Sequence, residues 1–286
     1  MWEPRGHADM YGAIITESVT KDADLGVLFL HNAGLSPMCG HGIIALATVI
    51  IETGMFPAKH PETILKIDTP AGLVTAFCQV GGRSFKRVRS VRFHNVPSFV
   101  LGLDEVIDVP GMGKVRYDLA FGGAFYAYVR SEPLDLSLVP ENAGRLIEAG
   151  MAIKRAIMNK RRIVHPFKKD LNFLYGTIFI GPPVSAANHD RNVCIFANGE
   201  LDRSPTGTGV SGRVAIHYAR GELKLGQALA VESIVGSRFI GRAVKEVDFG
   251  SYKAVIPEVE GSAFIIGRHE FFFDPDDSFG GGFFIR

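Results

Sequence analysis

The sequence contains little cysteine and almost no tryptophan, with three Cys and one Trp among 286 residues. Cys39, Cys78 and Cys194 are an odd number of cysteines and lie far apart, which argues against a disulfide framework and is typical of a reducing compartment. An excess of charge of one sign is also missing, because 31 basic residues stand against 30 acidic ones. This balance argues against nucleic acid as a partner.

Long hydrophobic runs are absent too. The most apolar stretch, residues 43–51, is far shorter than the about 18 residues that a membrane span needs, and the N-terminus lacks the pattern of a signal peptide. We therefore expect no membrane contact and a cytoplasmic location. What the sequence does contain is 47% hydrophobic residues, enough for a sizeable core and about two domains.

Short runs of β-branched and aromatic residues alternate with Gly, Pro, Asn and Asp clusters along most of the chain. These runs predict strands at residues 26–31, 71–77, 90–96, 115–121, 124–129, 173–180, 192–197, 237–244, 253–259 and 262–273. Apolar spacing predicts helices over 42–53, 140–160 and 209–220. Cys78, in the run AGLVTAFCQV (71–80), and Cys194, in NVCIFA (192–197), lie in strand-like runs, where cysteine usually acts as a small hydrophobe. The expected class is α+β.

Two stretches carry the same pattern: MCGHGIIALATVIIETG (38–54) and PTGTGVSGRVAIHYARG (205–221). In each, Gly-x-Gly follows a focal residue, Cys39 or Thr206. A glycine fifteen residues after it, Gly54 or Gly221, suits the left-handed position just beyond a helix. The repetition predicts two similar halves, each directing one helix N-terminus at a shared cavity.

A helix N-terminus presents free backbone N–H groups and the positive end of the helix dipole, so it binds anions and favours a thiolate. Cys39 is therefore a candidate base, and Gly40 and Gly42 would let a ligand approach the backbone closely. Cys39 could equally be a buried residue that caps an apolar helix, and these residues alone leave both readings open. Metal binding has little support, since only His41 accompanies the cysteine and structural zinc takes four ligands. The sequence gives no more support for a cysteine protease.

Residues 207–212 also match the G-x-G-x-x-G pattern of dinucleotide-binding proteins, and they open a predicted helix. That motif requires a strand directly before the first glycine. Here the nearest predicted strand ends near Ala197, with a polar connection in between. We therefore do not expect a nicotinamide cofactor.

Taken together, MCGHG (38–42) and DRSPTGTG (202–209) resemble the motifs of the proline racemase family. The resemblance extends to essentially the whole chain through PRGHADMYGA (4–13), NVCIFANGELDRSP (192–205), FFFDPDD (271–277) and GGGFFIR (280–286). It implies two pseudo-symmetric domains of the diaminopimelate-epimerase type, each a curved sheet around a central helix, with the active site in the cleft and neither cofactor nor metal. The expected domains are residues 1–108 with 265–286, and residues 109–264.

Members of that family usually carry several dozen further residues ahead of the stretch that corresponds to residues 4–13. Because this sequence opens almost directly on that stretch, we expect a first domain with fewer strands than in the family and an exposed sheet edge. Activity of this chain is accordingly a separate question from its family.

Racemases and epimerases of the family carry a cysteine in both motifs, one for each face of the substrate. Here the second position is Thr206, whose hydroxyl is too weak an acid and base for a symmetric relay. The chain thus resembles the trans-3-hydroxy-L-proline dehydratases, in which Cys39 would take the α-proton and the 3-hydroxyl would leave as water, giving pyrroline-2-carboxylate. Thr206 would face the opposite side of the ring, near the ring hydroxyl or a water.

The resemblance also implies binding residues: for the carboxylate Gly40, His41, Gly207 and Thr208, for the ammonium Asp202, and for the pocket walls Tyr11 and Phe196. Asp202 could otherwise be a turn residue, His41 a plain helix-start residue, and both aromatics core residues. The expected partners are a small imino acid and, in a homodimer, a second copy of the chain. Two other functions stay open, a proline racemase or 4-hydroxyproline 2-epimerase and a non-catalytic imino-acid-binding protein.

Overall fold

The computed structural model describes residues 1–81 and 87–285. Its helices are α1 (Gly40–Glu52), α2 (Ala143–Lys160) and α3 (Gly207–Ala219), with short 3-10 helices η1 (Glu132–Leu134), η2 (Pro140–Asn142) and η3 (Lys169–Leu171). Its strands are β1 (Tyr11–Thr16), β2 (Leu25–His31), β3 (Gly34–Ser36), β4 (Glu62–Thr69), β5 (Gly72–Gly81), β6 (Arg87–His94), β7 (Ser98–Val109), β8 (Gly113–Phe121), β9 (Phe125–Arg130), β10 (Leu174–Gly181), β11 (Asp190–Phe196), β12 (Glu200–Leu201), β13 (Leu229–Glu232), β14 (Arg238–Phe249) and β15 (Tyr252–Gly261).

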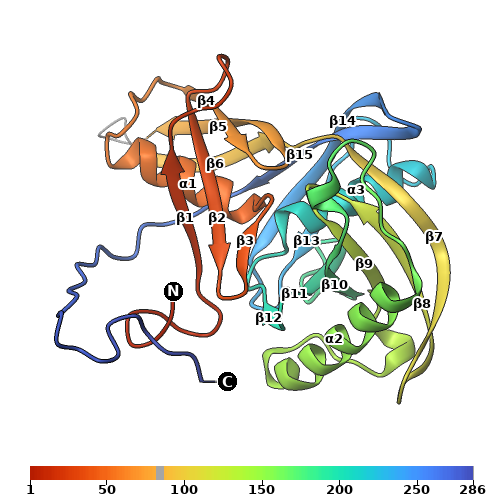
Figure 1. Cartoon of the computed structure of the whole chain (residues 1–286). Helices are drawn as coiled ribbons and strands as arrows, with labels where there is room; N and C mark the ends of the chain where they lie inside the picture. Colours follow the sequence, from red (N-terminus) through yellow and green to blue (C-terminus); the bar gives the residue numbers. More distant parts are fainter. Residues whose placement is uncertain (82–86, 286) are drawn as a thin grey trace.

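The strands of the second half close on themselves. They are neighbours in the order β7-β8-β9-β10-β11-β13-β14-β15, and β15 pairs in turn with β7. Helix α3 packs against β7, β8, β14 and β15 and is buried from Gly207 to Ile216, while α2 covers β10 and β11 (Figure 1). The second half is therefore a closed barrel around a buried helix.

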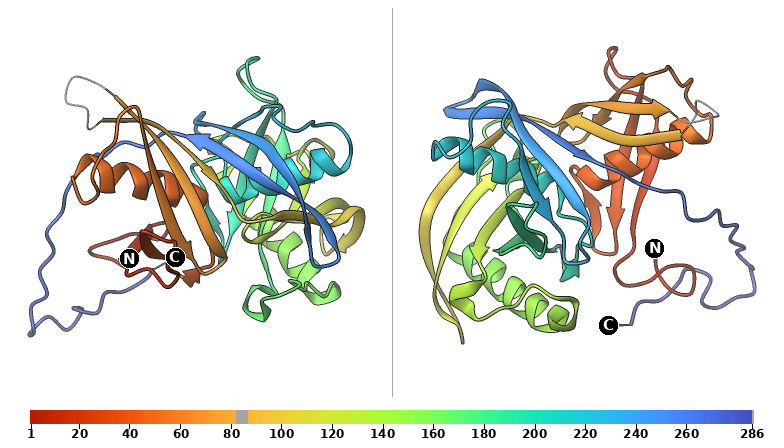
Figure 2. Two further views of the ribbon diagram at one scale, coloured as in Figure 1. Left: turned by 90° about the horizontal axis from the view of Figure 1, so that it is seen from above. Right: turned by 180° about the vertical axis from the view of Figure 1, so that it is seen from behind.

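The first half is an open version of the same arrangement. Its strands follow the order β1-β2-β4-β5-β6, and β6 pairs with the end of β15 at Glu258–Gly261. Helix α1 packs against β5, β6 and β15, and β1 forms the edge of the sheet. Because β15 also pairs with β14, this one strand joins the two halves (Figures 1 and 2).

The three predicted helices are confirmed to within a few residues. Helices α1 and α3 have equal lengths of 13 residues. The glycine just beyond each is left-handed, with φ of +78° at Gly54 and +72° at Gly221, a conformation that a residue with a Cβ adopts at a cost. In the described part of the chain, none of the helices has the length and apolar character needed to cross a membrane.

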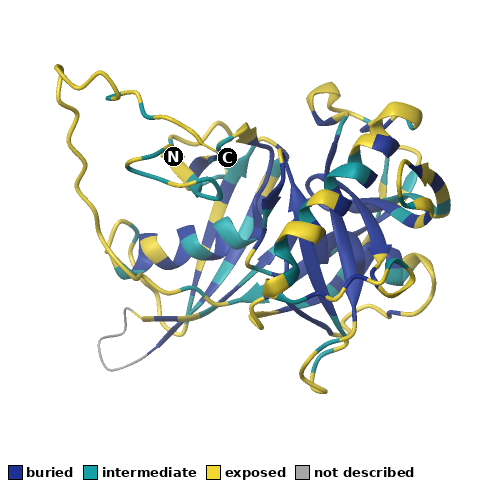
Figure 3. Cartoon of the chain, turned by 90° about the horizontal axis from the view of Figure 1, so that it is seen from below, coloured by how far each residue is buried: buried dark blue, intermediate teal, exposed yellow. Residues whose placement is uncertain are grey.

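The strand predicted at residues 262–273 is wrong. Beyond Gly261 the chain leaves the sheet without regular structure and exposes large apolar side chains, such as Ile266 at 98% and Phe272 at 79% (Figures 1 and 3). A strand forms only where another strand accepts and donates its hydrogen bonds, and none of the described residues does so here. The chain returns to the N-terminal residues near its end. Arg5 lies over the ring of Phe273 and donates a hydrogen bond to the carbonyl of Gly280, and Glu3 forms a bridge with Phe283.

The domain boundary near residue 108 stays a prediction. Strand β7 pairs with β8 and with β15, so the pairing favours a boundary just before Ser98.

Candidate active site

The N-termini of α1 and α3 meet backbone to backbone at Gly40 and Gly207. A Cβ on Gly40 would lie 2.5 Å from Cα of Gly207, and a Cβ on Gly207 would lie 2.6 Å from Cα of Gly40. Both distances are shorter than any side chain tolerates, so only glycine permits this contact. The unpaired N–H groups of both helices consequently open into the same small space.

Cys39 is the N-cap residue of α1. Its backbone is extended, with φ −137° and ψ 110°, and its Sγ accepts a hydrogen bond of 3.3 Å from the backbone N–H of Gly42. An N–H directed at the sulfur and the positive end of the helix dipole both stabilise negative charge there. The side chain is buried at the start of an apolar helix. This position is compatible both with a structural cap residue and with a catalytic base.

Thr206 holds the corresponding place ahead of α3 but is used differently. Its φ of +67° is in the left-handed region, which is uncommon for a β-branched residue. Its Oγ1 donates a hydrogen bond of 2.8 Å to Oδ2 of Asp202 instead of accepting one from the helix. The carbonyl of Pro205, next to it, accepts a bond of 3.2 Å from Nδ2 of Asn192. The second helix N-terminus thus presents a hydroxyl already committed to a carboxylate.

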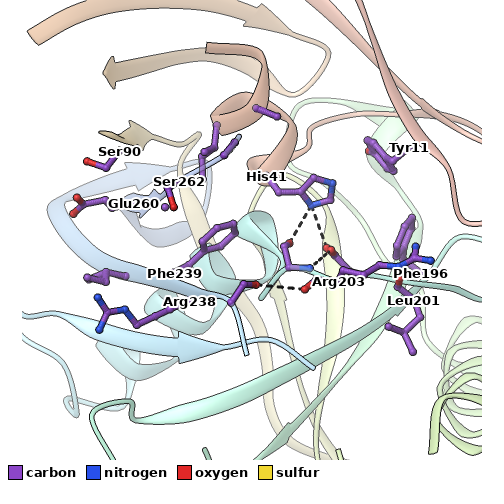
Figure 4. A pocket seen from close by; sticks show the side chains of 18 of the residues that line it. Tyr11, His41, Ser90, Phe196, Leu201, Arg203, Arg238, Phe239, Glu260 and Ser262 are labelled. Atoms are coloured by element: carbon purple, nitrogen blue, oxygen red, sulfur yellow. Dashed lines mark hydrogen bonds and ion pairs between the residues drawn. The ribbon is translucent and has the colours of Figure 1, made fainter. Parts of the chain in front are cut away.

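His41 and Asp202 form an ion pair beneath the two helix ends. Nδ1 of His41 lies 3.3 Å from Oδ2 of Asp202 and 3.1 Å from Oγ of Ser204, while Oδ1 of Asp202 accepts the N–H of Ser204 at 2.8 Å (Figure 4). Burial alone lowers the pKa of His41, but Cys39 and Asp202 outweigh it and raise that pKa well above its ordinary value. Burial raises the pKa of Asp202, but His41, Ser204 and Thr206 outweigh it and hold that pKa below its usual range.

All nine site residues named from the sequence line one pocket: Tyr11, Cys39, Gly40, His41, Phe196, Asp202, Thr206, Gly207 and Thr208. The pocket also includes three residues that sequence reasoning missed, Met38, Tyr126 and Tyr175. Tyr126 Oη lies 2.8 Å from Oγ1 of Thr208, so Tyr126 orients a residue that was predicted to bind the substrate carboxylate. The enclosed volume is about 10 Å³, room for about one water molecule. A five-membered ring enters only if these side chains move apart.

A cavity of about 730 Å³ adjoins this pocket and shares Tyr11, His41, Phe196 and Asp202 with it. Figure 4 shows Tyr11 and Phe196 beyond His41 at one end of the cavity, and Arg238, Ser90 and Glu260 at the other. The aromatic pair, with ring centroids 6.0 Å apart, stands where the cavity meets the pocket. The cavity thus ends at the residues that close off the pocket. Residues 1–81 and 87–285 contain no group of three or more His, Cys, Asp or Glu placed to hold a metal ion.

Comparison with known proteins accounts for this arrangement. A sequence model of one family, described as proline racemase, matches residues 1–284. The chain belongs to the proline racemase family. A solved hydroxyproline epimerase from Agrobacterium vitis, with bound trans-4-hydroxy-L-proline, superposes with a TM-score of 0.94 at 34% identity, covering 100% of this chain and 81% of that one. The predicted proline-racemase fold is confirmed.

Two names among the relatives within the proline racemase family concern 3-hydroxyproline. A trans-3-hydroxy-L-proline dehydratase from Colwellia psychrerythraea is 47% identical over 100% of this chain and 80% of its own length. A 3-hydroxyproline 2-epimerase from Burkholderia multivorans is 46% identical over 100% of this chain and 84% of its own. Several further relatives of comparable identity, a human protein among them, bear the dehydratase name.

Proposed function

We propose that this chain dehydrates trans-3-hydroxy-L-proline to pyrroline-2-carboxylate, with Cys39 as its one catalytic base. The observation that carries the proposal is the inequality of the two helix ends, a thiol on α1 and a hydroxyl bonded to Asp202 on α3. Relatives that match the whole of this chain at 46–47% identity and are named for this reaction support it.

The binding step uses charge and backbone. The substrate carboxylate lies between the two helix ends, where N–H groups at Gly40, His41, Gly207 and Thr208 and both helix dipoles attract an anion. The substrate ammonium is held by Asp202, whose lowered pKa keeps the carboxylate ionised. Holding both charges fixes the ring and makes the α-carbon more acidic.

The chemical step needs one base. Cys39 takes the α-proton, the electron pair forms the C2–C3 double bond, and the 3-hydroxyl leaves as water. The resulting enamine tautomerises to the imine in solution. Racemisation would need a second base on the other face, and the hydroxyl of Thr206 both is too weak and donates its proton to Asp202. The Thr206 hydroxyl therefore has Asp202 as its partner. From the sequence, a bond to the 3-hydroxyl of the substrate or to a water was expected instead.

Turnover with product identification tests the proposal. Incubation of the purified chain with trans-3-hydroxy-L-proline should produce an imine that reacts with carbonyl reagents, and L-proline treated alike should not. A chain that leaves the substrate unchanged while it binds pyrrole-2-carboxylate, a planar mimic of the deprotonated ring, would instead be a non-catalytic imino-acid-binding protein.

The epimerase name of one relative makes 3-hydroxyproline 2-epimerisation the second candidate. It predicts uptake of deuterium from deuterated water together with inversion at the α-carbon, and no imine. A homodimer and a cytoplasmic location remain predictions, and light scattering on the purified chain tests the first.

A further inference from the structure

The mechanism above does not say which group delivers a proton to the leaving hydroxyl, and this inference rests on that proposed function. The 3-hydroxyl must be protonated to leave as water. In the trans isomer the hydroxyl and the carboxylate lie on opposite faces of the ring, so the hydroxyl lies on the same face as the α-hydrogen. The base that takes this hydrogen and the acid that assists the hydroxyl therefore act from one side, the side of Cys39.

Tyr175 lines the same pocket as Cys39 and lies at an irregularity in its strand. Along the pairing of β10 with β9, Leu174 faces Phe125 and Gly176 faces Tyr126, so Tyr175 is an extra residue in a β-bulge. Bulges next to active sites re-aim a side chain. The carbonyl of Tyr175 accepts a hydrogen bond of 3.1 Å from the N–H of Ala197, which fixes the bulge.

The hydroxyl of Tyr175 is buried and unpaired. The residue is 5% exposed, lines the pocket that Cys39 also lines, and its Oη has no hydrogen-bond partner among the residues that the structure describes. Its ring stacks on Phe196, with centroids 5.5 Å apart, and is edge-on to Tyr126 at 5.7 Å. An orphaned hydroxyl costs free energy unless a ligand completes it.

Burial keeps the hydroxyl of Tyr175 protonated. Burial raises the pKa of Tyr175 far above its ordinary value, the nearby Ser36 and Tyr11 act in the opposite direction, and Cys39 raises this pKa further. Two other hydroxyls of the pocket are already paired, since Thr206 donates to Asp202 and Tyr126 is paired with Thr208. The hydroxyl of Tyr175 is thus available to a substrate.

We propose that Tyr175 is the general acid of the dehydration: its Oη hydrogen-bonds the 3-hydroxyl of the bound substrate and protonates it as the C3–O bond breaks. In that step the Cys39 thiolate takes the α-hydrogen as a proton, the C–H electron pair forms the C2–C3 double bond, and the C3–O electron pair leaves with the oxygen. The oxygen takes the phenolic proton and departs as water. The phenolate of Tyr175 then takes the proton from the Cys39 thiol, because a thiol is the stronger acid. Both groups return to their starting state.

Tyr175→Phe tests this, because it removes only the orphaned oxygen. Dehydration of trans-3-hydroxy-L-proline should fall by about 10²–10⁴-fold, the usual worth of a general acid. Binding of pyrrole-2-carboxylate, which has no hydroxyl, should stay within about threefold, less than 1 kcal/mol. The thermal midpoint should stay equal or rise, because an unpaired buried hydroxyl is gone.

Tyr117→Phe on β8 is the matched control. Its Oη is also buried but donates to Glu105 Oε2 at 2.7 Å, outside the pocket, so this variant should dehydrate at the wild-type rate. Wild-type dehydration by Tyr175→Phe, or a parallel loss of pyrrole-2-carboxylate binding and thermal stability, would overturn the inference. Failure of the wild-type chain to form the imine would instead overturn the proposed function, so the two failures are distinct.

Discussion

The two helices of the site, α1 and α3, have the same length, a Gly-x-Gly start and a glycine just beyond their last turn. The residues directly before them nevertheless differ in chemistry. Ahead of α1 an extended Cys39 caps its helix through Sγ, whereas ahead of α3 a left-handed Thr206 gives its hydroxyl to Asp202. Their surroundings differ as well, because α3 lies in a closed barrel and α1 under an open sheet. In the proposed reaction, binding of the substrate carboxylate uses the Gly-x-Gly start that the two helices share, whereas proton transfer uses the thiol that only the first helix carries.

The largest effect should come from removing the distinguishing thiol. Cys39→Ser keeps the helix cap but replaces the base by a hydroxyl, so imine formation should fall by about 10²–10⁴-fold. Cys78→Ala is the control, because burial raises the pKa of Cys78 to about 12 and the residue lies outside the site. Steady-state assays of both variants measure the difference; full activity in Cys39→Ser would exclude this base.

Next in size is the shared backbone contact. Gly40→Ala would place a Cβ 2.5 Å from Gly207, and overpacking of this kind costs about 1–3 kcal/mol. Gly144→Ala in α2 meets no atom within 4 Å, and it should stabilise the fold by about 0.5–1 kcal/mol. Urea unfolding of the two variants gives the comparison. Equal stability would show that the helix ends separate without cost.

Making the two ends equal should change the outcome of the reaction. Thr206→Cys offers a second thiol across the ring, so inversion at the α-carbon should appear in deuterated water. Loss of the bond to Asp202 should slow dehydration by about tenfold, the worth of one hydrogen bond to a charged group. Chiral chromatography of recovered substrate detects inversion. Its absence would mean that residue 206 does not reach the opposite face.

The smallest effect concerns how the stability contributed by the His41–Asp202 ion pair depends on pH. The pKa of His41 is raised in the folded chain, so the protonated ring stabilises the fold below about pH 6.5, the pKa of an unfolded histidine, and this contribution is lost as pH rises through the folded pKa. His41→Gln should therefore show a flatter thermal midpoint above pH 6.5 than the wild type. His269→Gln, on the exposed stretch beyond β15, should follow the wild type; parallel curves for all three would contradict the assignment.

Local rules were enough for the parts of the molecule that local chemistry decides. The glycines at 54 and 221 and the apolar spacing before each of them marked α1 and α3. The resemblance to the proline racemase family then marked nine of the residues that line the pocket. Residues 262–273 misled because a strand depends on a partner elsewhere in the chain, which composition does not reveal. Tyr126 and Tyr175 were missed because β10 is buried along its whole length and β9 along all but its last residue, so alternation gives no direction, and a bulge leaves no local signature.

The touching backbones at Gly40 and Gly207 have a consequence for how this scaffold diversifies. In the proposed mechanism, backbone N–H groups bind the carboxylate, and a side-chain substitution leaves such groups in place. A substitution at residue 39 or 206, immediately before these glycines, would therefore alter the proton-transfer chemistry while the backbone that binds the carboxylate stays unchanged.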